Sequence, residues 1–201
     1  MKVAVLGARN VGGTLGRKWA RAGHEVMFGV RHTDNPEVRN LAAEVGAQVG
    51  SIEEAIAFGD VVVFAIPGRV MAETIRTHGQ ALAGKIVVDT ANRLEEAVSN
   101  SAADFVAHAP GVRIFRAFNS IAWENFENPQ FGDVQADLFY CGPDGEARVQ
   151  VEQLISDVGM RPVRVGDVDQ VEVVDAVLRL FFALARGQNR GRHLAFKMLT
   201  R

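Results

Sequence analysis

A short loop near the start of the chain has the residue types that bind a pyrophosphate. The run Gly7-Ala8-Arg9-Asn10-Val11-Gly12 follows an apolar, strand-like segment and opens a helical pattern, which is where a dinucleotide-binding fingerprint must lie. Gly7 permits the tight turn, and Gly12 lets the helix pack close to the strand. The helix N-terminus offers amide groups and a positive dipole end to the phosphates. We therefore predict that the cofactor is bound by Gly7, Ala8, Arg9, Asn10, Val11 and Gly12.

Arg9 occupies the position of the middle glycine in the usual pattern, where the backbone approaches the pyrophosphate. Two interpretations stay open at this point. Arg9 either moves the cofactor slightly or adds its own positive charge to the site.

The end of the second strand-like segment indicates which dinucleotide the site prefers. The run Gly29-Val30-Arg31-His32-Thr33 has no carboxylate before Asp34. An acid at this place binds the ribose 2′-hydroxyl of NAD, whereas a planar guanidinium binds the 2′-phosphate of NADP in a bidentate manner. We therefore predict NADP(H) as the cofactor, with Arg31 and His32 in its site. Arg9 is a second candidate for the same phosphate.

Three further segments follow strand-like runs, and ligands of open α/β sheets bind beyond the carboxyl ends of the strands. They are Ala65-Ile66-Pro67, Thr90-Ala91-Asn92 and Ala117-Phe118-Asn119. The backbone of Ala65, Ile66 and Pro67 is predicted to contact ribose and pyrophosphate. Asn92 and Asn119 are candidates for hydrogen bonds to the cofactor carboxamide or to the substrate. The alternative for both asparagines is a bond to loop backbone, because asparagine is common in turns.

No set of side chains forms a recognisable acid–base, nucleophile or metal site, so we assign no catalytic residue and no metal ligand. The five histidines are scattered. Cys141 is the only cysteine, which excludes an internal disulfide and a Cys-based zinc site, and it is expected to be a small buried hydrophobe. Hydride transfer between two bound cofactors requires orientation and exclusion of water, and not necessarily a protein proton donor.

The elements that must position these residues alternate along the chain. Strands are predicted at 2–6, 25–30, 60–66, 85–89, 112–118, 138–141 and 161–165, and helices between them, among them 52–58, 70–82, 101–108 and 145–158. This alternation predicts an α/β fold, a Rossmann-type doubly wound and mostly parallel sheet with helices on both faces. We predict an NADP-binding domain over residues 1–166 and a C-terminal helical extension over 167–201 packed on it.

The C-terminal segment, about 168–186, is predicted to be one long helix with two apolar stripes. Between the stripes lies a narrow polar strip, in which Asp175 and Arg179 have a favourable i, i+4 spacing. Such a helix either packs in a groove of the core or forms a subunit interface or the wall of a substrate pocket. The basic residues that follow form either a solvated face or a docking site for an anionic tail of a second cofactor.

Composition excludes several classes of protein. The chain has 201 residues, a net charge of −2 and 48% hydrophobic residues, which are ordinary globular values and not those of a disordered or strongly basic nucleic-acid-binding protein. No apolar run approaches the length of a membrane span. The first residues show no signal-peptide pattern. We expect a cytoplasmic protein without nucleic-acid or membrane partners.

Several of these runs together resemble a known family. Residues 3–16, followed by Ala22-Gly23-His24-Glu25-Val26, are similar to the start of the NADPH-dependent F420 reductases, and the similarity continues through 65–67, 82–89, 116–120 and 195–197. Arg9 and Arg93 depart from the family pattern. The resemblance implies a Rossmann domain with a small helical C-terminal part, a homodimer, and hydride transfer between NADPH and a deazaflavin without an assigned protein acid or base. The oxidoreductase domain of six-transmembrane metalloreductases, in which NADPH reduces a flavin, is similar too.

These observations predict an NADP-dependent oxidoreductase that passes a hydride between NADP(H) and a small-molecule electron acceptor, either coenzyme F420 or a flavin. The first alternative is a non-catalytic NADP(H)-binding module that acts as a redox sensor or regulatory subunit. A third possibility, reduction of a small carbonyl or imine, usually requires a proton donor near the carbonyl.

Overall fold

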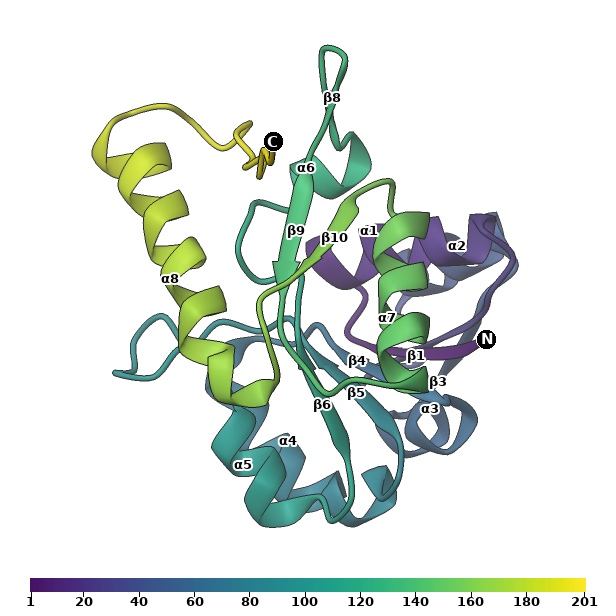
Figure 1. The fold of residues 1–201 in the computed structure, drawn as a ribbon. Helices are drawn as coiled ribbons and strands as arrows, with labels where there is room; N and C mark the ends of the chain where they lie inside the picture. Colours follow the sequence, from purple (N-terminus) through teal and green to yellow (C-terminus); the bar gives the residue numbers. More distant parts are fainter. The chain divides into compact units, whose positions relative to one another are not determined.

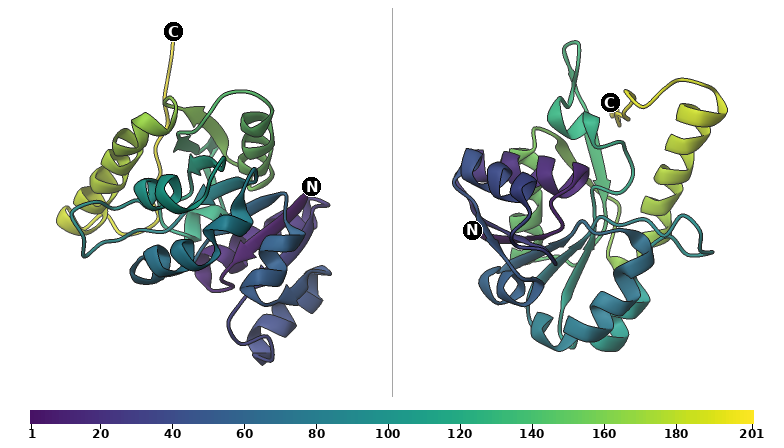
Figure 2. Two further views of the ribbon diagram at one scale, coloured as in Figure 1. Left: turned by 90° about the horizontal axis from the view of Figure 1, so that it is seen from below. Right: turned by 180° about the vertical axis from the view of Figure 1, so that it is seen from behind.

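We describe the protein from a computed structural model that covers residues 1–201. The chain divides into two compact units, Met1–Ile114 and Phe115–Arg201, and each is described by itself (Figures 1 and 2). The boundary predicted after residue 166 lies inside the second unit. The assignment of residues 167–201 as a helical extension stays a prediction.

The first unit is built on a parallel sheet with the strand order β3-β2-β1-β4-β5-β6. Its strands are β1 (Lys2–Leu6), β2 (Glu25–Gly29), β3 (Gln48–Gly50), β4 (Val61–Phe64), β5 (Ile86–Asp89) and β6 (Arg113–Arg116), the last of which ends in the second unit. β1 lies in the centre, and its Val3 is paired with both Val26 and Val61. The strand order reverses between β1 and β4. This reversal is the topological switch point at which such sheets bind ligands.

Helices cover both faces of this sheet. They are α1 (Asn10–Arg21), α2 (Pro36–Val45), α3 (Ile52–Phe58), α4 (Met71–His78) and α5 (Ala102–His108). Figure 1 shows α1 and α2 on one side and α3, α4 and α5 on the other. Local sequence explains where two of them start. The Asn35 side chain accepts a hydrogen bond from the Glu37 amide, and Ser51 and Glu54 form a reciprocal capping box.

The core of the first unit lies along the central strands. Residues Val61–Phe64 of β4 are inaccessible to solvent, as are Val3–Leu6 of β1. A strand that is covered on both faces has such a continuous apolar run, which is why the sequence indicates these strands clearly. On the two faces, Trp19 is fully buried, and Phe64 and Phe105 meet edge to face with ring centroids 5.0 Å apart.

The second unit contains a smaller parallel β–α–β motif. β9 (Asp137–Tyr140) pairs with β10 (Arg161–Arg164), and α7 (Glu146–Asp157) connects them. Before the motif come α6 (Glu124–Glu127) and a hairpin of β7 (Gln130–Phe131) and β8 (Val134–Gln135). After it, a 3₁₀ turn (Val168–Gln170) leads into α8 (Val171–Phe182), which ends in a π-helical turn (Ala183–Gly187).

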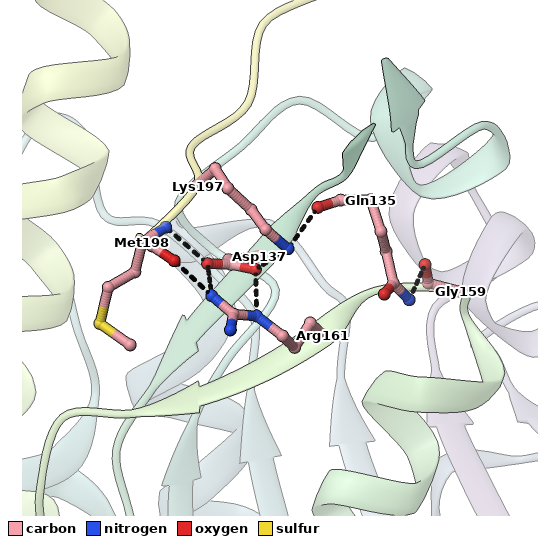
Figure 3. A network of polar contacts seen from close by, with 6 residues as sticks. All are labelled: Gln135, Asp137, Gly159, Arg161, Lys197 and Met198. Atoms are coloured by element: carbon pink, nitrogen blue, oxygen red, sulfur yellow. Dashed lines mark hydrogen bonds and ion pairs between the residues drawn. The ribbon is translucent and has the colours of Figure 1, made fainter. Parts of the chain in front are cut away.

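The C-terminal segment is fastened to β9 by one buried carboxylate (Figure 3). Asp137 forms a backbone bridge to Phe196, and its carboxylate accepts hydrogen bonds from Arg161 Nε (2.7 Å), Lys197 Nζ (3.0 Å) and the Met198 amide (2.7 Å). Burial would raise the pKa of this carboxyl, but the hydrogen bonds from Arg161, Met198 and Lys197 outweigh it and lower the pKa to about 2. Residues 196–198 are therefore part of the second unit's structure.

The predicted fold class is confirmed, with differences in detail. The strands predicted at 138–141 and 161–165 exist, but they form a sheet of their own. The short strand β3 and the hairpin β7–β8 were not expected, because two or three residues are too few to show a strand periodicity. The predicted helix at 70–82 is α4 with a 3₁₀ turn at either end. None of the helices combines the length and the apolar composition that a membrane span requires.

The C-terminal helix differs from expectation in two ways. One of its predicted apolar stripes is buried, with Leu178 and Phe181 at its centre, whereas Val173 and Leu180 of the other stripe are 46% and 48% exposed. The i, i+4 spacing of Asp175 and Arg179 in the predicted polar strip does not give an ion pair, because Asp175 is fully buried and Arg179 lies 3.9 Å from Glu172 instead. The reason is a buried cationic partner, described below.

Candidate nucleotide-binding site

The loop after β1 lies close to the ends of two neighbouring strands. Gly7 has a φ of +97°, and its amide donates a hydrogen bond to the Gly29 carbonyl at the end of β2 (2.9 Å). A Cβ on Gly7 would lie 2.5 Å from the carbonyl oxygen of Ala65, and a Cβ on Gly12 would lie 2.1 Å from that of Gly7. Both positions therefore require glycine, as the fingerprint predicts.

The N-terminus of α1 is suited to an anion. Arg9 is the cap residue, but its side chain makes no capping hydrogen bond, and the first turn contains no acidic residue. Arg9 and Asn10 are exposed, and Ala8 and Val11 are partly exposed. The first amides of a helix have no partner within the helix and carry the positive end of its dipole. This end of α1 can thus receive a phosphate group.

Arg31 and His32 lie on the exposed loop after β2. The Val30 amide donates to the Gly50 carbonyl (3.0 Å) and the Asn35 amide to the His32 carbonyl (3.2 Å), so the backbone is fixed on both sides of Arg31. Neither Arg31 nor Arg9 forms a side-chain hydrogen bond or ion pair within the chain. A guanidinium without an internal carboxylate partner keeps its charge and its donors for an external phosphate.

The segment after β4 lies against the glycine loop. The Ala65 amide donates to the Leu6 carbonyl (2.9 Å), and the Ile66 side chain lies 3.4 Å from where a Cβ on Gly7 would stand. Ala65 and Ile66 are partly exposed, and Pro67 is exposed. These three residues therefore border the same loop that the sequence assigns to the phosphates.

The segment after β5 is anchored by a buried carboxylate that the sequence analysis did not single out. Asp89 accepts hydrogen bonds from the amides of Ala91 and Ser101, both at 3.0 Å. The partly exposed Asn92 follows, and its backbone lies directly against Gly68, since a Cβ on Gly68 would stand 2.2 Å from the Asn92 carbonyl oxygen. The loops after β4 and β5 are thus packed on each other.

The first unit therefore brings most of the predicted residues to one edge of its sheet. Because the strands are parallel, the loops after β1, β2, β4 and β5 all leave the sheet at its carboxyl edge. These loops, together with the first turn of α1, carry every predicted site residue except Asn119. That residue belongs to the second unit.

Asn119 is buried and makes an internal contact. Its Nδ2 donates a hydrogen bond to Asp175 Oδ1 (3.1 Å), and Arg116 donates to the same oxygen from Nε (3.0 Å) and lies within 2.9 Å of it through Nη2. All three side chains are at most 2% exposed. The amide nitrogen of Asn119 is therefore directed to a carboxylate. The sequence analysis had considered only a bond to the cofactor or substrate and a bond to loop backbone.

The sequence did contain a signal for this cluster. Arg116 stands within the apolar run 114–118, and a charge at a strand position of that kind requires an opposite charge. Its partner lies 59 residues later in the chain. Nothing local marks Asp175 as that partner, because its spacing to Arg179 suggests a surface pair instead.

Cys141 is fully buried, as predicted. Burial raises the pKa of its thiol to about 12, so that the thiolate is scarce at neutral pH. No group of three or more His, Cys, Asp or Glu side chains is arranged to hold a metal ion.

The fold and the loop geometry define the chain as a Rossmann-type protein whose glycine loop has the spacing and the steric requirements of a dinucleotide-binding fingerprint. Residues 2–93 match the family described as NADP oxidoreductase, coenzyme F420-dependent, which confirms the resemblance carried by the motifs. The class predicted for the chain, an NADP-dependent oxidoreductase, is the class of this family.

Curated relatives extend the match beyond residue 93. The chain is 30% identical over 187 residues to metalloreductase STEAP3 of Rattus norvegicus, covering 89% of this chain but 37% of that protein. It is 25% identical over 210 residues to the F420-dependent NADP reductase of Methanocaldococcus jannaschii, covering 92% of each. The chain thus spans about a third of the metalloreductases and nearly all of the archaeal reductase.

Solved structures show the same fold. A candidate F420-dependent NADP reductase from Arthrobacter sp. FB24 superimposes with a TM-score of 0.84 at 23% identity and full coverage of both chains. A reductive aminase from Aspergillus terreus, solved in complex with NADPH, superimposes with a TM-score of 0.68 at 20% identity over 92% of this chain and 63% of its own.

Proposed function

We propose that the protein transfers a hydride between NADP(H) and a flavin-like or deazaflavin acceptor, of which coenzyme F420 is the first candidate. The observation that carries the proposal is the glycine loop at the open N-terminus of α1, next to a strand end that bears the unpaired Arg31. This arrangement lies within the residues that match the F420-dependent NADP oxidoreductase family.

The residues present fit the cofactor. The absence of a Cβ at Gly7 and Gly12 lets the loop after β1 pack closely on the Ala65 carbonyl and on the start of α1, and α1 has no side-chain cap that would compete with a phosphate. In this proposal the pyrophosphate is held by residues 7–12 and the 2′-phosphate by Arg31, with His32 beside it and Arg9 adding charge. Ala65, Ile66, Pro67 and Asn92 border the remainder of the dinucleotide, and Asn119 stays a predicted contact.

The nicotinamide supplies or accepts the hydride when it is bound. The chain's own residues hold and orient the dinucleotide and shield it from water, because the loop residues at this edge include no acid–base pair. A flavin or deazaflavin requires only such orientation, whereas a carbonyl also requires a proton donor. The archaeal relative, named F420-dependent NADP reductase and matched over nearly its whole length, supports the deazaflavin as acceptor.

Two further features remain proposals. The half-exposed Val173 and Leu180 on α8 are consistent with a homodimer. We also propose a cytoplasmic location, since neither F420 nor flavin reduction by NADPH requires another compartment.

The test is a panel of acceptors. The oxidation of NADPH by the purified protein is measured with F420, FMN, FAD and small carbonyls, and the heat of binding is measured with NADPH and NADH. We expect turnover with F420 or a flavin and tighter binding of NADPH than of NADH. Binding of NADPH without turnover on any acceptor would instead support the non-catalytic redox-sensing module, and no heat with either dinucleotide would reject both functions.

A further inference from the structure

Arg39 of α2 lies against the loop that carries Arg31. Its Nε donates a hydrogen bond to the Thr33 carbonyl (2.9 Å), and its backbone amide donates to the Asn35 carbonyl at the start of the helix (3.1 Å). Consecutive Cα atoms are about 3.8 Å apart, so the Cα atoms of Arg31 and Thr33 are at most about 7.6 Å from each other. The guanidinium of Arg39 is therefore held beside the segment that we assign to the 2′-phosphate.

Most of the donors of Arg39 have no acceptor within the chain. Only the Nε donor of its guanidinium is bonded, and neither Nη group forms a hydrogen bond or an ion pair. The exposed carboxylates nearest to it in sequence, Asp34 and Glu37, do not pair with it. Arg21 and Arg93 of the same unit, by contrast, both pair with carboxylates. Arg39 thus keeps its charge and its two Nη groups for an external anion, which they can bind in a bidentate manner.

The stability of α2 does not explain a cation at this position. Arg39 lies near the N-terminus of α2, where the helix dipole disfavours a positive charge, and the last turn, where the dipole would favour one, contains no basic residue. Glu37 and Arg39 are two residues apart, so they do not face each other on the helix. An anion bound between the loop and the start of α2 would compensate this charge.

We propose that Arg39 is a second guanidinium for the 2′-phosphate of NADP(H), bound through its Nη groups while Arg31 approaches from the loop after β2. A phosphate monoester carries a charge of about −1.5 to −2 at neutral pH, which a single guanidinium neutralises only in part. This inference rests on the proposed function. It deepens it by naming a specificity-determining residue that lies outside the glycine loop and the end of β2.

The test uses two probes that differ only in the 2′-phosphate. Adenosine 2′,5′-bisphosphate carries this group and 5′-AMP lacks it, and neither contains the nicotinamide. Isothermal titration measures the dissociation constants of both probes for the wild type, R31A, R39A and R31A/R39A. R113A is the matched control, because Arg113 is also exposed and also donates to a backbone carbonyl, that of Gly84 (2.6 Å), but lies at the amino end of β6.

We expect R39A to weaken the binding of adenosine 2′,5′-bisphosphate about tenfold, because one charge-assisted contact to the 2′-phosphate is lost. The affinity for 5′-AMP should stay unchanged, and R113A should bind both probes as the wild type does. R31A/R39A should bind the bisphosphate more weakly than either single variant, because each guanidinium makes its own contact with the phosphate.

Three results would overturn the proposal. The first is an R39A protein that binds the bisphosphate as the wild type does. The second is a double variant that binds it no more weakly than R31A, since Arg39 would then only hold the loop in place for Arg31. The third is a wild type with equal affinity for the two probes.

These outcomes are separate from those of the proposed function. If no acceptor turns over, hydride transfer to a flavin or deazaflavin is rejected, but the affinities for the bisphosphate still decide the role of Arg39. If the wild type oxidises NADPH and R39A binds the bisphosphate normally, the enzyme assignment stands and the second guanidinium is rejected.

Discussion

Asp137 and Arg161 are register partners in the first pair of the β9–β10 ladder, and the guanidinium of Arg161 spans both carboxylate oxygens at 2.7 and 2.6 Å. The pair is asymmetric in burial, because the Asp137 side chain is inaccessible while that of Arg161 is 39% exposed. The cationic groups that compensate the buried charge therefore come from the surface side and include Lys197 of the C-terminal segment.

The ion pair of Asp137 and Arg161 predicts how the free energy of unfolding depends on pH. Since folding lowers the pKa of Asp137 to about 2, its contribution is complete above about pH 4 and is lost as the pH falls through 2. D137N is expected to be less stable than the wild type by about 2 kcal/mol at pH 6. Below pH 3 the difference should shrink.

Denaturant unfolding of D137N and the wild type, carried out from pH 6 to pH 2, measures this difference in unfolding free energy. D133N, in the exposed turn of the β7–β8 hairpin, is the control and should follow the wild type at every pH. A stability difference between D137N and the wild type that stays constant from pH 6 to pH 2 contradicts the assignment.

Cofactor choice is expected to depend on Arg31. R31A loses a charged, bidentate partner of the 2′-phosphate, so the affinity for NADPH should fall about 10- to 100-fold, while the affinity for NADH stays as it is. Isothermal titration with both dinucleotides checks this. R76A, an exposed arginine of α4, is the matched control. An R31A protein that binds NADPH as the wild type does would remove the basis for NADP preference.

The glycine loop makes a steric prediction. In G12A the new Cβ would stand 2.1 Å from the Gly7 carbonyl, so the loop or α1 must move. We expect a loss of about 1–3 kcal/mol of unfolding free energy and of measurable NADPH binding. G187A is the control, because a Cβ at Gly187 meets nothing within 4 Å. Retained NADPH binding by G12A would show that the loop tolerates a side chain and does not cradle the phosphates.

Cys141 is expected to be chemically inert in the folded protein. Its thiol is buried and its pKa is raised to about 12, so alkylation with iodoacetamide at pH 8 should give no adduct by mass spectrometry. The same treatment in denaturant should give one adduct. Rapid labelling of the native protein would show that the strand end at Cys141 opens to solvent.

The sequence predicts best what is encoded locally. The helix at 52–58 matches the structure because Ser51 and Glu54 form its capping box within three residues, and the glycine loop lies within six. The loops at the strand ends follow from the parallel order of the sheet. For these parts, neighbours in sequence are also neighbours in space.

What was missed depends on distant partners. That β9 pairs with β10 and not with the central sheet is decided by long-range packing, and so is the burial of Asp175, whose partners are 56 and 59 residues away. The anchoring role of Asp89 could be read from neither periodicity nor motif, because its two amide donors lie on either side of an irregular loop.

Because Gly68 packs directly on the Asn92 backbone, the loop after β4 and the loop after β5 cannot move toward each other at this point. Asn92 in turn follows the turn that Asp89 holds through the Ala91 amide. Any side chain larger than that of glycine at position 68 would therefore disturb the loops after both strands at once.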